Sequence, residues 1–338
     1  MVTQLLSRRD IERARGLIEG SGLTFEQNFD TLLGIFANGE LAAAGARQGR
    51  LLKMLAVAPA HQGGPLLGEL VGELLCSAYA AGQAPCFIVT RPQTAASFQA
   101  LNFVPLVRHP KAVLLEEGHG LERYLESRRA LVRDGENGAV VVNCNPFTLG
   151  HRYLIEQAAA RSDTLYVFVV REERSLFPYG VRRRLVEAGV RDLDNVVILD
   201  GGDYAVSTVT FPAYFLKDAA TAEQVQMEVD LQLFARRIAP FFNIRRRFVG
   251  SEPYCRTTRR YGEAMQRLLP PLGIAVSRIE RCAVAGEAIS ASRVRTAMRH
   301  EAFETMRQLV PPTTLDFILS GQGRALGEEL RHHQLRRH

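Results

Sequence analysis

The chain has 338 residues and a formal net charge of +6, and 46% of its residues are hydrophobic, which predicts about two ordinary globular domains. No apolar run reaches the roughly 20 residues of a membrane-spanning helix, and the first residues lack the apolar core of a signal peptide. We therefore expect a cytoplasmic protein without a membrane partner. The basic residues are scattered and predict no nucleic-acid partner. The five cysteines are widely spaced without a C-x-x-C pair, which supports neither a disulfide framework nor a metal site.

Residues 1–117 predict a domain of mixed strands and helices. The clearest turn signal is Asn38-Gly39 between two apolar runs, because this pair suits a tight hairpin. The expected elements, in chain order, are a helix over 7–20, strands over 31–36, 41–46 and 51–57, a helix over 62–81, a strand over 86–90, a short helix over 94–101 and a strand over 112–115. This order resembles the fold of the GCN5-related acetyltransferases.

One loop of this domain departs from the family that it resembles. In GCN5-related acetyltransferases, a Q/R-x-x-G-x-G/A loop binds the pyrophosphate of coenzyme A through backbone amides. The matching stretch here begins at Gln62, and Pro65 and Leu67 occupy the two glycine positions. Proline has no N–H to donate, and Leu67 is expected to block close approach. We expect a domain retained for packing or partner docking, with acetyl-CoA binding as the alternative.

A helix is expected over 118–133, followed by a polar, glycine-rich break at 134–138. We therefore expect a linking helix in 118–134, a catalytic domain in 135–322 and a frayed basic tail in 323–338. The catalytic domain shows strands at 139–142, 164–170, 196–199 and up to 250, a helix at 180–189, and an ambiguous stretch at 222–239 whose length favours a helix. Alternating strands and helices predict a Rossmann-like parallel sheet, so the fold class is α/β.

The catalytic domain opens with an unbroken apolar run at 139–142, as in a strand buried on both faces. Asn143, Asn145 and Pro146 interrupt it, and helical spacing begins near Gly150. The first amides of a helix lack intrahelical partners and attract anions. The sequence therefore predicts an anion site at the end of this strand.

Two side chains could complete that site. Thr148 offers a hydroxyl and His151 an imidazole, three residues apart and thus on one side of the first helical turn. Gly150 would let the backbone approach a phosphate. A plainly capped helix with an incidental histidine is the alternative.

A second polar stretch, Ile-Ser-Ala-Ser-Arg-Val-Arg, occupies residues 289–295. Ser290 and Ser292 supply hydroxyls at the start of a helical segment, and serine is a good N-cap. Arg295 supplies a guanidinium, which can bind phosphate through two hydrogen bonds. Taken alone, the stretch could also be a serine cap with solvated arginines.

Together the two stretches resemble the nucleotidyltransferase superfamily, whose members carry an H/T-x-G-H turn after the first strand and a later I-S-x-S-x-x-R stretch. Both patterns occur here in that order. Residues 175–178, 202–217 and 249–255 narrow the resemblance to the citrate lyase ligase family. This likeness covers nearly the whole chain, including the acetyltransferase-like first domain.

The resemblance implies an activity in two steps. ATP and acetate would give acetyl-adenylate and pyrophosphate, with Mg²⁺ bridging phosphate oxygens. The thiol prosthetic group of the citrate lyase acyl carrier protein would then take the acetyl group and release AMP. The expected catalytic residues are His151, Thr148 and Lys217. The expected nucleotide-binding residues are Asn143, Asn145, Phe147, Gly150, His151, Arg182, Gly250, Glu252, Ser290, Ser292 and Arg295.

Alternatives remain open at this point. Cys144 in the turn could be a nucleophile, although adenylyl transfer depends mainly on positioning and charge stabilisation. The protein could be an adenylyltransferase that acts on a phosphate acceptor such as a pantetheine phosphate. It could also be an acetyl-CoA-dependent N-acetyltransferase that uses the first domain, against which Pro65 and Leu67 count.

Overall fold

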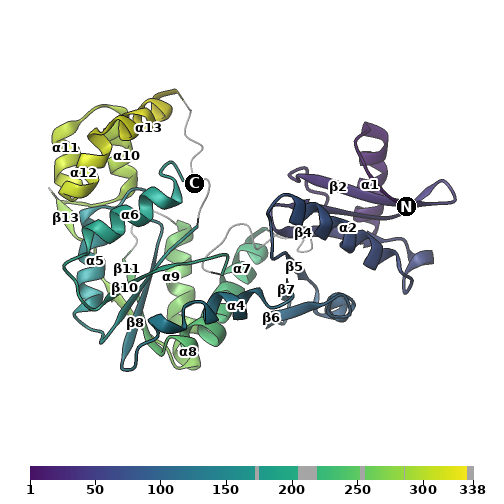
Figure 1. Ribbon diagram of the computed structural model, residues 1–338, viewed down its shortest axis with the longest axis horizontal. Coiled ribbons are helices and arrows are strands. Elements are labelled where there is room, and N and C mark those ends of the chain that lie inside the picture. Colours follow the sequence, from purple (N-terminus) through teal and green to yellow (C-terminus); the bar gives the residue numbers. More distant parts are fainter. Residues whose placement is uncertain (172–174, 205–218, 252–255, 285, 333–338) are drawn as a thin grey trace. The chain divides into compact units, whose positions relative to one another are not determined.

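The computed structural model in Figure 1 describes residues 1–171, 175–204, 219–251, 256–284 and 286–332. The chain divides into two compact units. Unit 1 comprises Met1–Glu126 and Thr208–Leu233, and unit 2 comprises Ser127–Ser207 and Phe234–His338. No helix among the described residues is both long enough and apolar enough to cross a bilayer.

Unit 1 is built on a seven-stranded mixed sheet with the order β1-β2-β3-β4-β5-β7-β6. Strands β4 and β5 are parallel, and the other neighbouring strands are antiparallel. Its strands are β1 (Val2–Gln4), β2 (Thr31–Ala37), β3 (Glu40–Gln48), β4 (Leu51–Val57), β5 (Phe87–Thr90), β6 (Phe103–His109) and β7 (Ala112–Glu117). Its helices are α1 (Arg8–Gly20), η1 (Pro59–His61), α2 (Leu66–Ala80), η2 (Pro92–Thr94), α3 (Ala95–Gln99), α4 (Gly120–Glu126) and α7 (Ala219–Leu233).

The predicted elements of unit 1 are confirmed, with small shifts at their ends. Asn38 and Gly39 have φ of 52° and 82°, as the predicted hairpin turn requires. The sequence pattern missed β1 and β6. Pro105 lies within β6, but β6 is the last strand in the sheet order, where a residue without an N–H is tolerated.

The prediction of one linking helix over residues 118–133 is wrong, because the observed helix is shorter. The segment forms α4, which ends at Glu126, and the separate turn η3 (Arg129–Leu131). The apolar stripe of α4 consists of Leu121 and Leu125, both buried. Its next positions are arginines, so nothing apolar extends the helix against the core.

The ambiguous stretch at 222–239 is helical, as its length predicted. It forms α7 and the π-helical turn η5 (Phe234–Ile238). Helix α7 joins unit 1, where His109 Nε2 of β6 lies 2.9 Å from Glu228 Oε2. That assignment depends on a contact between residues far apart in sequence, which local spacing does not reveal.

Unit 2 contains five parallel strands in the order β10-β9-β8-β11-β12, which confirms the predicted Rossmann-like sheet. Its strands are β8 (Asn137–Val142), β9 (Leu165–Val169), β10 (Val196–Asp200), β11 (Ile244–Gly250) and β12 (Ala275–Ile279), with a small hairpin of β13 (Ala283–Val284) and β14 (Glu287–Ala288). Its remaining helices are α5 (Leu149–Ala159), α6 (Tyr179–Gly189), α8 (Ala239–Phe241), α9 (Arg256–Leu268), η6 (Pro270–Leu272), α10 (Ala291–Arg299), α11 (Phe303–Leu309), α12 (Pro312–Leu319) and α13 (Gly321–His332).

The sheet of unit 2 buries both faces. On β9, Val167 belongs to the apolar core that includes side chains of α5 and α6. Its neighbours Tyr166 and Phe168 contact Phe242, and Phe168 also contacts Phe234. This explains why β9 lacks alternating polar residues.

Strand β8 lies between β9 and β11. After β8 the chain forms β9 and β10 on one side of it, and then crosses to form β11 and β12 on the other side. This is the topological switch point, where open parallel sheets bind ligands beyond the carboxyl ends of the strands. The turn after β8 therefore lies at the position where a site is expected.

The expected basic tail is helical as far as the structure describes it. Helix α13 extends to His332, and its Leu330 is buried in the core of unit 2. Arg299 Nε donates a hydrogen bond of 3.3 Å to the carbonyl of Leu330. The many charged residues of the segment predicted a frayed tail, although a few apolar residues pack it against the core.

Candidate active site

Arg182 of α6 holds the turn between β8 and α5 through hydrogen bonds to backbone carbonyls. Its Nε donates to the carbonyl of Phe177 at 2.9 Å, and its Nη1 donates to the carbonyls of Asn143 at 2.7 Å and Val170 at 2.8 Å. Arg182 is the bulkiest of the fully buried side chains. These carbonyls satisfy the buried charge, which needs several acceptors to be stable, and the predicted role of Arg182 in nucleotide binding stays a prediction.

Two neighbouring side chains in the turn are also buried. Burial raises the pKa of the Cys144 thiol, which removes the thiolate that a nucleophile requires. Phe147 has no exposed surface and stacks on the His151 ring, with centroids 6.0 Å apart and planes 19° apart. Phe147 therefore orients the ring of His151, and its predicted role in nucleotide binding stays a prediction.

Thr148 and His151 form a reciprocal cap at the start of α5. The hydroxyl of Thr148 accepts the backbone N–H of His151 at 3.3 Å, and His151 Nδ1 accepts the backbone N–H of Thr148 at 3.1 Å. His151 takes the place of the Glu or Gln in the common capping box. Thr148 itself is buried, so its hydroxyl serves the cap.

The cap determines the tautomer of His151. A backbone N–H can only donate, so Nδ1 is the unprotonated nitrogen and Nε2 carries the proton. Burial, with a smaller effect from the charge of Arg281, lowers the pKa of His151 to about 4. At neutral pH the imidazole is therefore an uncharged donor through Nε2.

Gly150 joins this turn to the second polar stretch. A Cβ at position 150 would lie 3.1 Å from the carbonyl oxygen of Ile289 and 3.4 Å from its Cβ. Glycine at this position therefore permits close packing against Ile289. The approach of a phosphate to the same backbone stays a prediction. Ser290, the next residue, caps α10 by accepting the backbone N–H of Arg293 at 3.3 Å.

Arg295 of α10 forms a second link between α10 and the turn. Its Nη1 donates to the carbonyl of Asn145 at 2.6 Å, and its Nη2 donates to the hydroxyl of Ser292 at 3.3 Å. Burial lowers the pKa of Arg295. Thus Asn145, Ser290, Ser292 and Arg295, predicted from two motifs about 150 residues apart, lie together.

Residues 175–177 border the turn on its other side. Asn143 Nδ2 donates to the hydroxyl of Ser175 at 3.2 Å, and Asn145 Oδ1 accepts the backbone N–H of Phe177 at 3.0 Å. Both asparagines therefore organise the turn. Asn143 is also exposed and available to a ligand.

Gly250 ends β11, the strand beside β8, and contributes to a cavity of about 230 Å³ lined also by side chains of α9. The next residue, Ser251, accepts the backbone N–H of Arg281 through its hydroxyl at 3.1 Å and Arg281 Nε through its carbonyl at 2.6 Å. Sequence analysis missed Arg281. Recognition of β12 would have placed it just beyond the carboxyl end of the strand next to β11. The predicted residues Lys217 and Glu252 lie outside the described residues.

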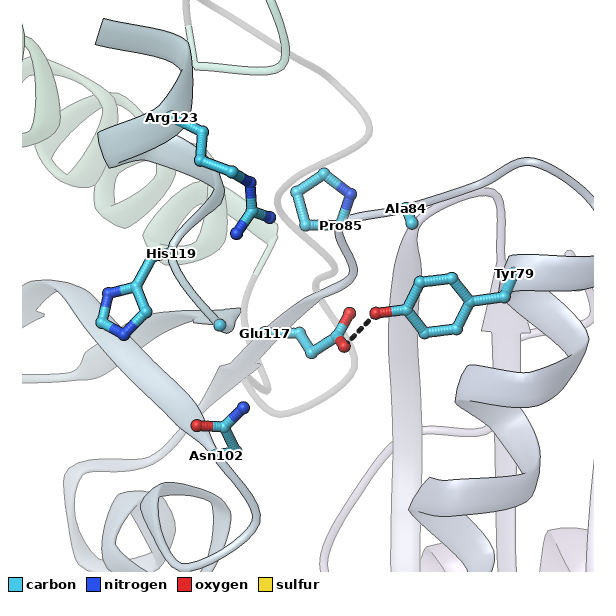
Figure 2. Close-up of a pocket in the computed structure, with 8 residues that line it drawn as sticks. Tyr79, Ala84, Pro85, Asn102, Glu117, His119 and Arg123 are labelled. Carbon is cyan, nitrogen blue, oxygen red and sulfur yellow. Dashed lines mark hydrogen bonds between the residues drawn. The ribbon is translucent and has the colours of Figure 1, made fainter. Parts of the chain in front are cut away.

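Unit 1 contains a separate cavity of about 540 Å³, shown in Figure 2. Tyr79 donates a hydrogen bond to Glu117 at its edge, and this bond, with burial, raises the pKa of Tyr79 to about 12. The phenol is therefore uncharged at neutral pH. None of the predicted site residues that the structure describes lines this cavity.

The described side chains around the turn suit an anion. They supply an imidazole N–H, hydroxyls, amides and guanidiniums, and the amides at the start of α5 carry the positive end of its dipole. Within the described ranges, no group of three or more His, Cys, Asp or Glu side chains could hold a metal ion. A divalent cation here would take its ligands mainly from a bound phosphate group.

Comparison with known proteins identifies the family to which these features belong. Residues 137–318 match the family model of the citrate lyase ligase C-terminal domain. The chain is 41% identical over 289 residues to a [citrate [pro-3S]-lyase] ligase of Klebsiella pneumoniae, a match that covers 82% of this chain and 84% of the relative. It is 34% identical over 306 residues to the enzyme of the same name from Escherichia coli K12, covering 88% and 86% of the two chains.

We expect Gly150→Ala to destabilise unit 2, because the added methyl group would press on the carbonyl of Ile289. Overpacking of this kind costs about 1–3 kcal/mol. Gly262→Ala in α9 is the matched control, since a Cβ at that position would meet nothing within 4 Å, and it should stabilise the chain by about 0.5–1 kcal/mol. Denaturant unfolding followed by circular dichroism measures both. Equal stability of Gly150→Ala and wild type would contradict the packing argument.

We also expect His151 to make stability depend on pH. Its pKa is about 4 when folded against 6.5 ordinarily, so the unfolded chain binds the proton first and stability falls as pH drops below 6.5. Between pH 7.5 and 5 the loss from this group is about 2 kcal/mol. His151→Gln keeps a capping acceptor without titrating, so the stability difference between wild type and this variant should change by that amount. A difference independent of pH would rule out the assignment.

Proposed function

Because the chain belongs to the citrate lyase ligase family, we propose that this ligase activates acetate with ATP and transfers the acetyl group to the thiol prosthetic group of the citrate lyase acyl carrier protein. The observation that carries the proposal is the meeting of two motifs at the switch point of a parallel sheet. There the first turn of α5, which contains His151, packs against Ile289 just before α10, and Arg295 of α10 bonds to the carbonyl of Asn145.

In the first step, a carboxylate oxygen of acetate attacks the α-phosphorus of ATP. A carbon–oxygen–phosphorus linkage forms, and the bond from the α-phosphorus to the pyrophosphate oxygen breaks with its electrons moving to pyrophosphate. Negative charge grows on the phosphate oxygens in the transition state. The donors at the start of α5 are fixed before reaction, which is the condition for effective electrostatic stabilisation.

His151 serves this step as a hydrogen-bond donor rather than a base. Its Nδ1 accepts the N–H of Thr148, and its low pKa makes it a weak proton acceptor. Ser290, Ser292 and Arg295 suit the β- and γ-phosphates, since α10 begins at the same place. Mg²⁺ bound to the phosphates would neutralise part of their charge, because this ion usually keeps several waters and is held largely through substrate phosphates.

In the second step, the thiol sulfur of the carrier attacks the acetyl carbon. A carbon–sulfur bond forms, the carbon–oxygen bond to AMP breaks, and a proton is released. The leaving group is again a phosphate, so the same donors at α5 stabilise it as its charge develops. One anion site can therefore serve both steps.

Unit 1 has a different place in this proposal. Pro65 precedes the first residue of α2, and proline has no N–H to offer a pyrophosphate. Leu67 packs against the core of unit 1 rather than filling the loop. Pro65 therefore supports the interpretation of a retained fold, and ATP rather than acetyl-CoA is the proposed source of activation.

We expect His151→Ala to lower ATP-dependent acetylation of the carrier by about 10²–10³, the usual cost of one lost transition-state donor. His300→Ala, which changes a histidine elsewhere in unit 2, should keep wild-type activity. Transfer is followed by mass spectrometry of the carrier with ATP and acetate. Turnover of His151→Ala within threefold of wild type, or acetylation by acetyl-CoA without ATP, would refute the assignment.

We expect Arg295→Ala to raise the KM for ATP by about tenfold or more, because charged hydrogen bonds contribute roughly 1.5–3 kcal/mol. The KM for acetate should change much less. Arg307→Ala is the control, since this arginine on α11 is 65% exposed. Steady-state pyrophosphate release with each substrate varied gives both constants. Equal changes in the two KM values would place Arg295 outside the triphosphate site.

A further inference from the structure

The cavity of unit 1 has no part in the proposed function. It encloses about 540 Å³ and is lined from four segments of the chain, which are the end of α2, the residues just before β5, the turn before β6, and the end of β7 with α4. A volume of this order is typical of sites that bind small molecules. The chemistry of the lining therefore decides which ligand would suit it.

Backbone hydrogen bonds fix the wall of the cavity. The N–H of Glu117 at the end of β7 donates to the carbonyl of Cys86 at 2.9 Å, and the N–H of Gly118 donates to the carbonyl of Asn102 at 3.0 Å. Asn102 and Gly118 have φ of 66° and 63°, a conformation that asparagine and glycine tolerate. The two turns are thus tied together, and the wall is formed without a ligand.

Glu117 brings a carboxylate into this wall with half of its bonding capacity unused. Its Oε1 accepts the hydrogen bond of the Tyr79 hydroxyl. Its Oε2 is shielded from solvent and has no hydrogen-bond partner among the described residues. An unpaired buried acceptor costs free energy. A donor supplied by a ligand would recover that cost.

Arg123 brings the opposite charge from α4. The start of this helix is fixed to β7, because Glu116 Oε2 accepts the backbone N–H of Leu121 at 2.8 Å. The Arg123 side chain is exposed and forms no hydrogen bond or ion pair with any residue that the structure describes. Figure 2 shows its guanidinium and the carboxylate of Glu117 turned toward the same space. Two opposite charges therefore line one cavity without pairing.

The remaining ionisable group of the lining already has a partner. His119 Nδ1 lies 3.0 Å from Glu122 Oε2. The charges left for a ligand are one carboxylate and one guanidinium. Glu117 would repel a simple anion, and Arg123 would repel a simple cation. A ligand that carries both charges would be attracted at each end.

We propose that this cavity binds a small zwitterion, a molecule that carries an ammonium group and a carboxylate. The ammonium donates to Oε2 of Glu117, and the carboxylate accepts from the guanidinium of Arg123. The ring of Tyr79 and the ring of Pro85 supply an apolar part of the wall for the carbon chain between the two charges. The site is independent of the proposed function, which uses residues of unit 2.

The test uses glycine, β-alanine and γ-aminobutyrate, which hold the same two groups at increasing separation. Butylammonium and butyrate, which carry one charge each, are the matched probes. Calorimetric titration of the full chain measures each affinity. Since the proposed acetate site can also take a carboxylate, only binding that depends on Glu117 and Arg123 supports the inference.

Four variants separate charge from structure. Glu117→Gln keeps an acceptor for the Tyr79 hydroxyl and loses the charge, whereas Tyr79→Phe loses that hydrogen bond and keeps the charge. Arg123→Gln removes the opposite charge. Arg307→Gln on α11 is the control for loss of an exposed arginine elsewhere. Circular dichroism checks that each variant is folded.

We expect at least one of the three zwitterions to bind wild type. Its affinity should fall by about tenfold or more in Glu117→Gln and in Arg123→Gln, because each variant loses a charged hydrogen bond to the ligand. Tyr79→Phe and Arg307→Gln should keep the affinity of wild type. The probes with a single charge should bind more weakly by about the same factor.

The inference fails if none of the three zwitterions binds, or if Glu117→Gln and Arg123→Gln bind as tightly as wild type. Equal binding of a singly charged probe would also overturn it. A Tyr79→Phe variant as impaired as Glu117→Gln would mean that the hydrogen bond between the two side chains matters and the charge does not. Should Glu117→Gln fail to fold, Arg123→Gln decides the outcome, since that side chain is exposed.

Discussion

The close packing of Gly150 against Ile289 is the constraint on which the site of unit 2 depends. It brings the first turn of α5 to the residue that precedes the cap of α10. Arg295 then reaches back to the carbonyl of Asn145, which closes a ring of contacts between the two motifs. Because both helices begin at this place, their unpaired amides and capping hydroxyls are directed to one region. A larger residue at position 150 would separate these groups before any ligand arrived.

The chemistry of the site follows from how its polar groups are paired. His151 completes the cap of Thr148 with Nδ1, and this same bond directs its proton to Nε2. The guanidiniums of Arg182 and Arg295 are held by backbone carbonyls of the turn, at Asn143 and Asn145. Donors fixed in this way need little reorganisation when charge develops on a phosphate, which is the main route by which such sites accelerate reactions.

In unit 1 the fold and the chemistry of a site are separate questions. Its mixed sheet and apolar core are complete, and α7 returns to it through the pair of His109 and Glu228. The helix that would offer amides to a pyrophosphate begins just after Pro65. The fold alone therefore does not imply the chemistry of the acetyltransferases that it resembles.

Local pattern was enough to predict the features that depend on neighbouring residues. The buried strand β8, the helix start near Gly150, a serine cap before α10 and the hairpin at Asn38-Gly39 all follow from spacing and turn chemistry, and the structure confirms them. The motifs also identified the family, which comparison with known proteins established.

Only the tertiary structure decided how these residues are used. Arg182 and Phe147 are residue types that often bind nucleotides, yet packing buries both side chains at the turn. The hydroxyl of Thr148 is occupied by the cap. Arg281 matches no motif, and its place next to Ser251 follows from the pairing of β12 with β11 and from the two bonds that Ser251 accepts. Side-chain roles depend on burial and on partners far away in sequence, whereas a pattern of neighbouring residues records only which groups are present.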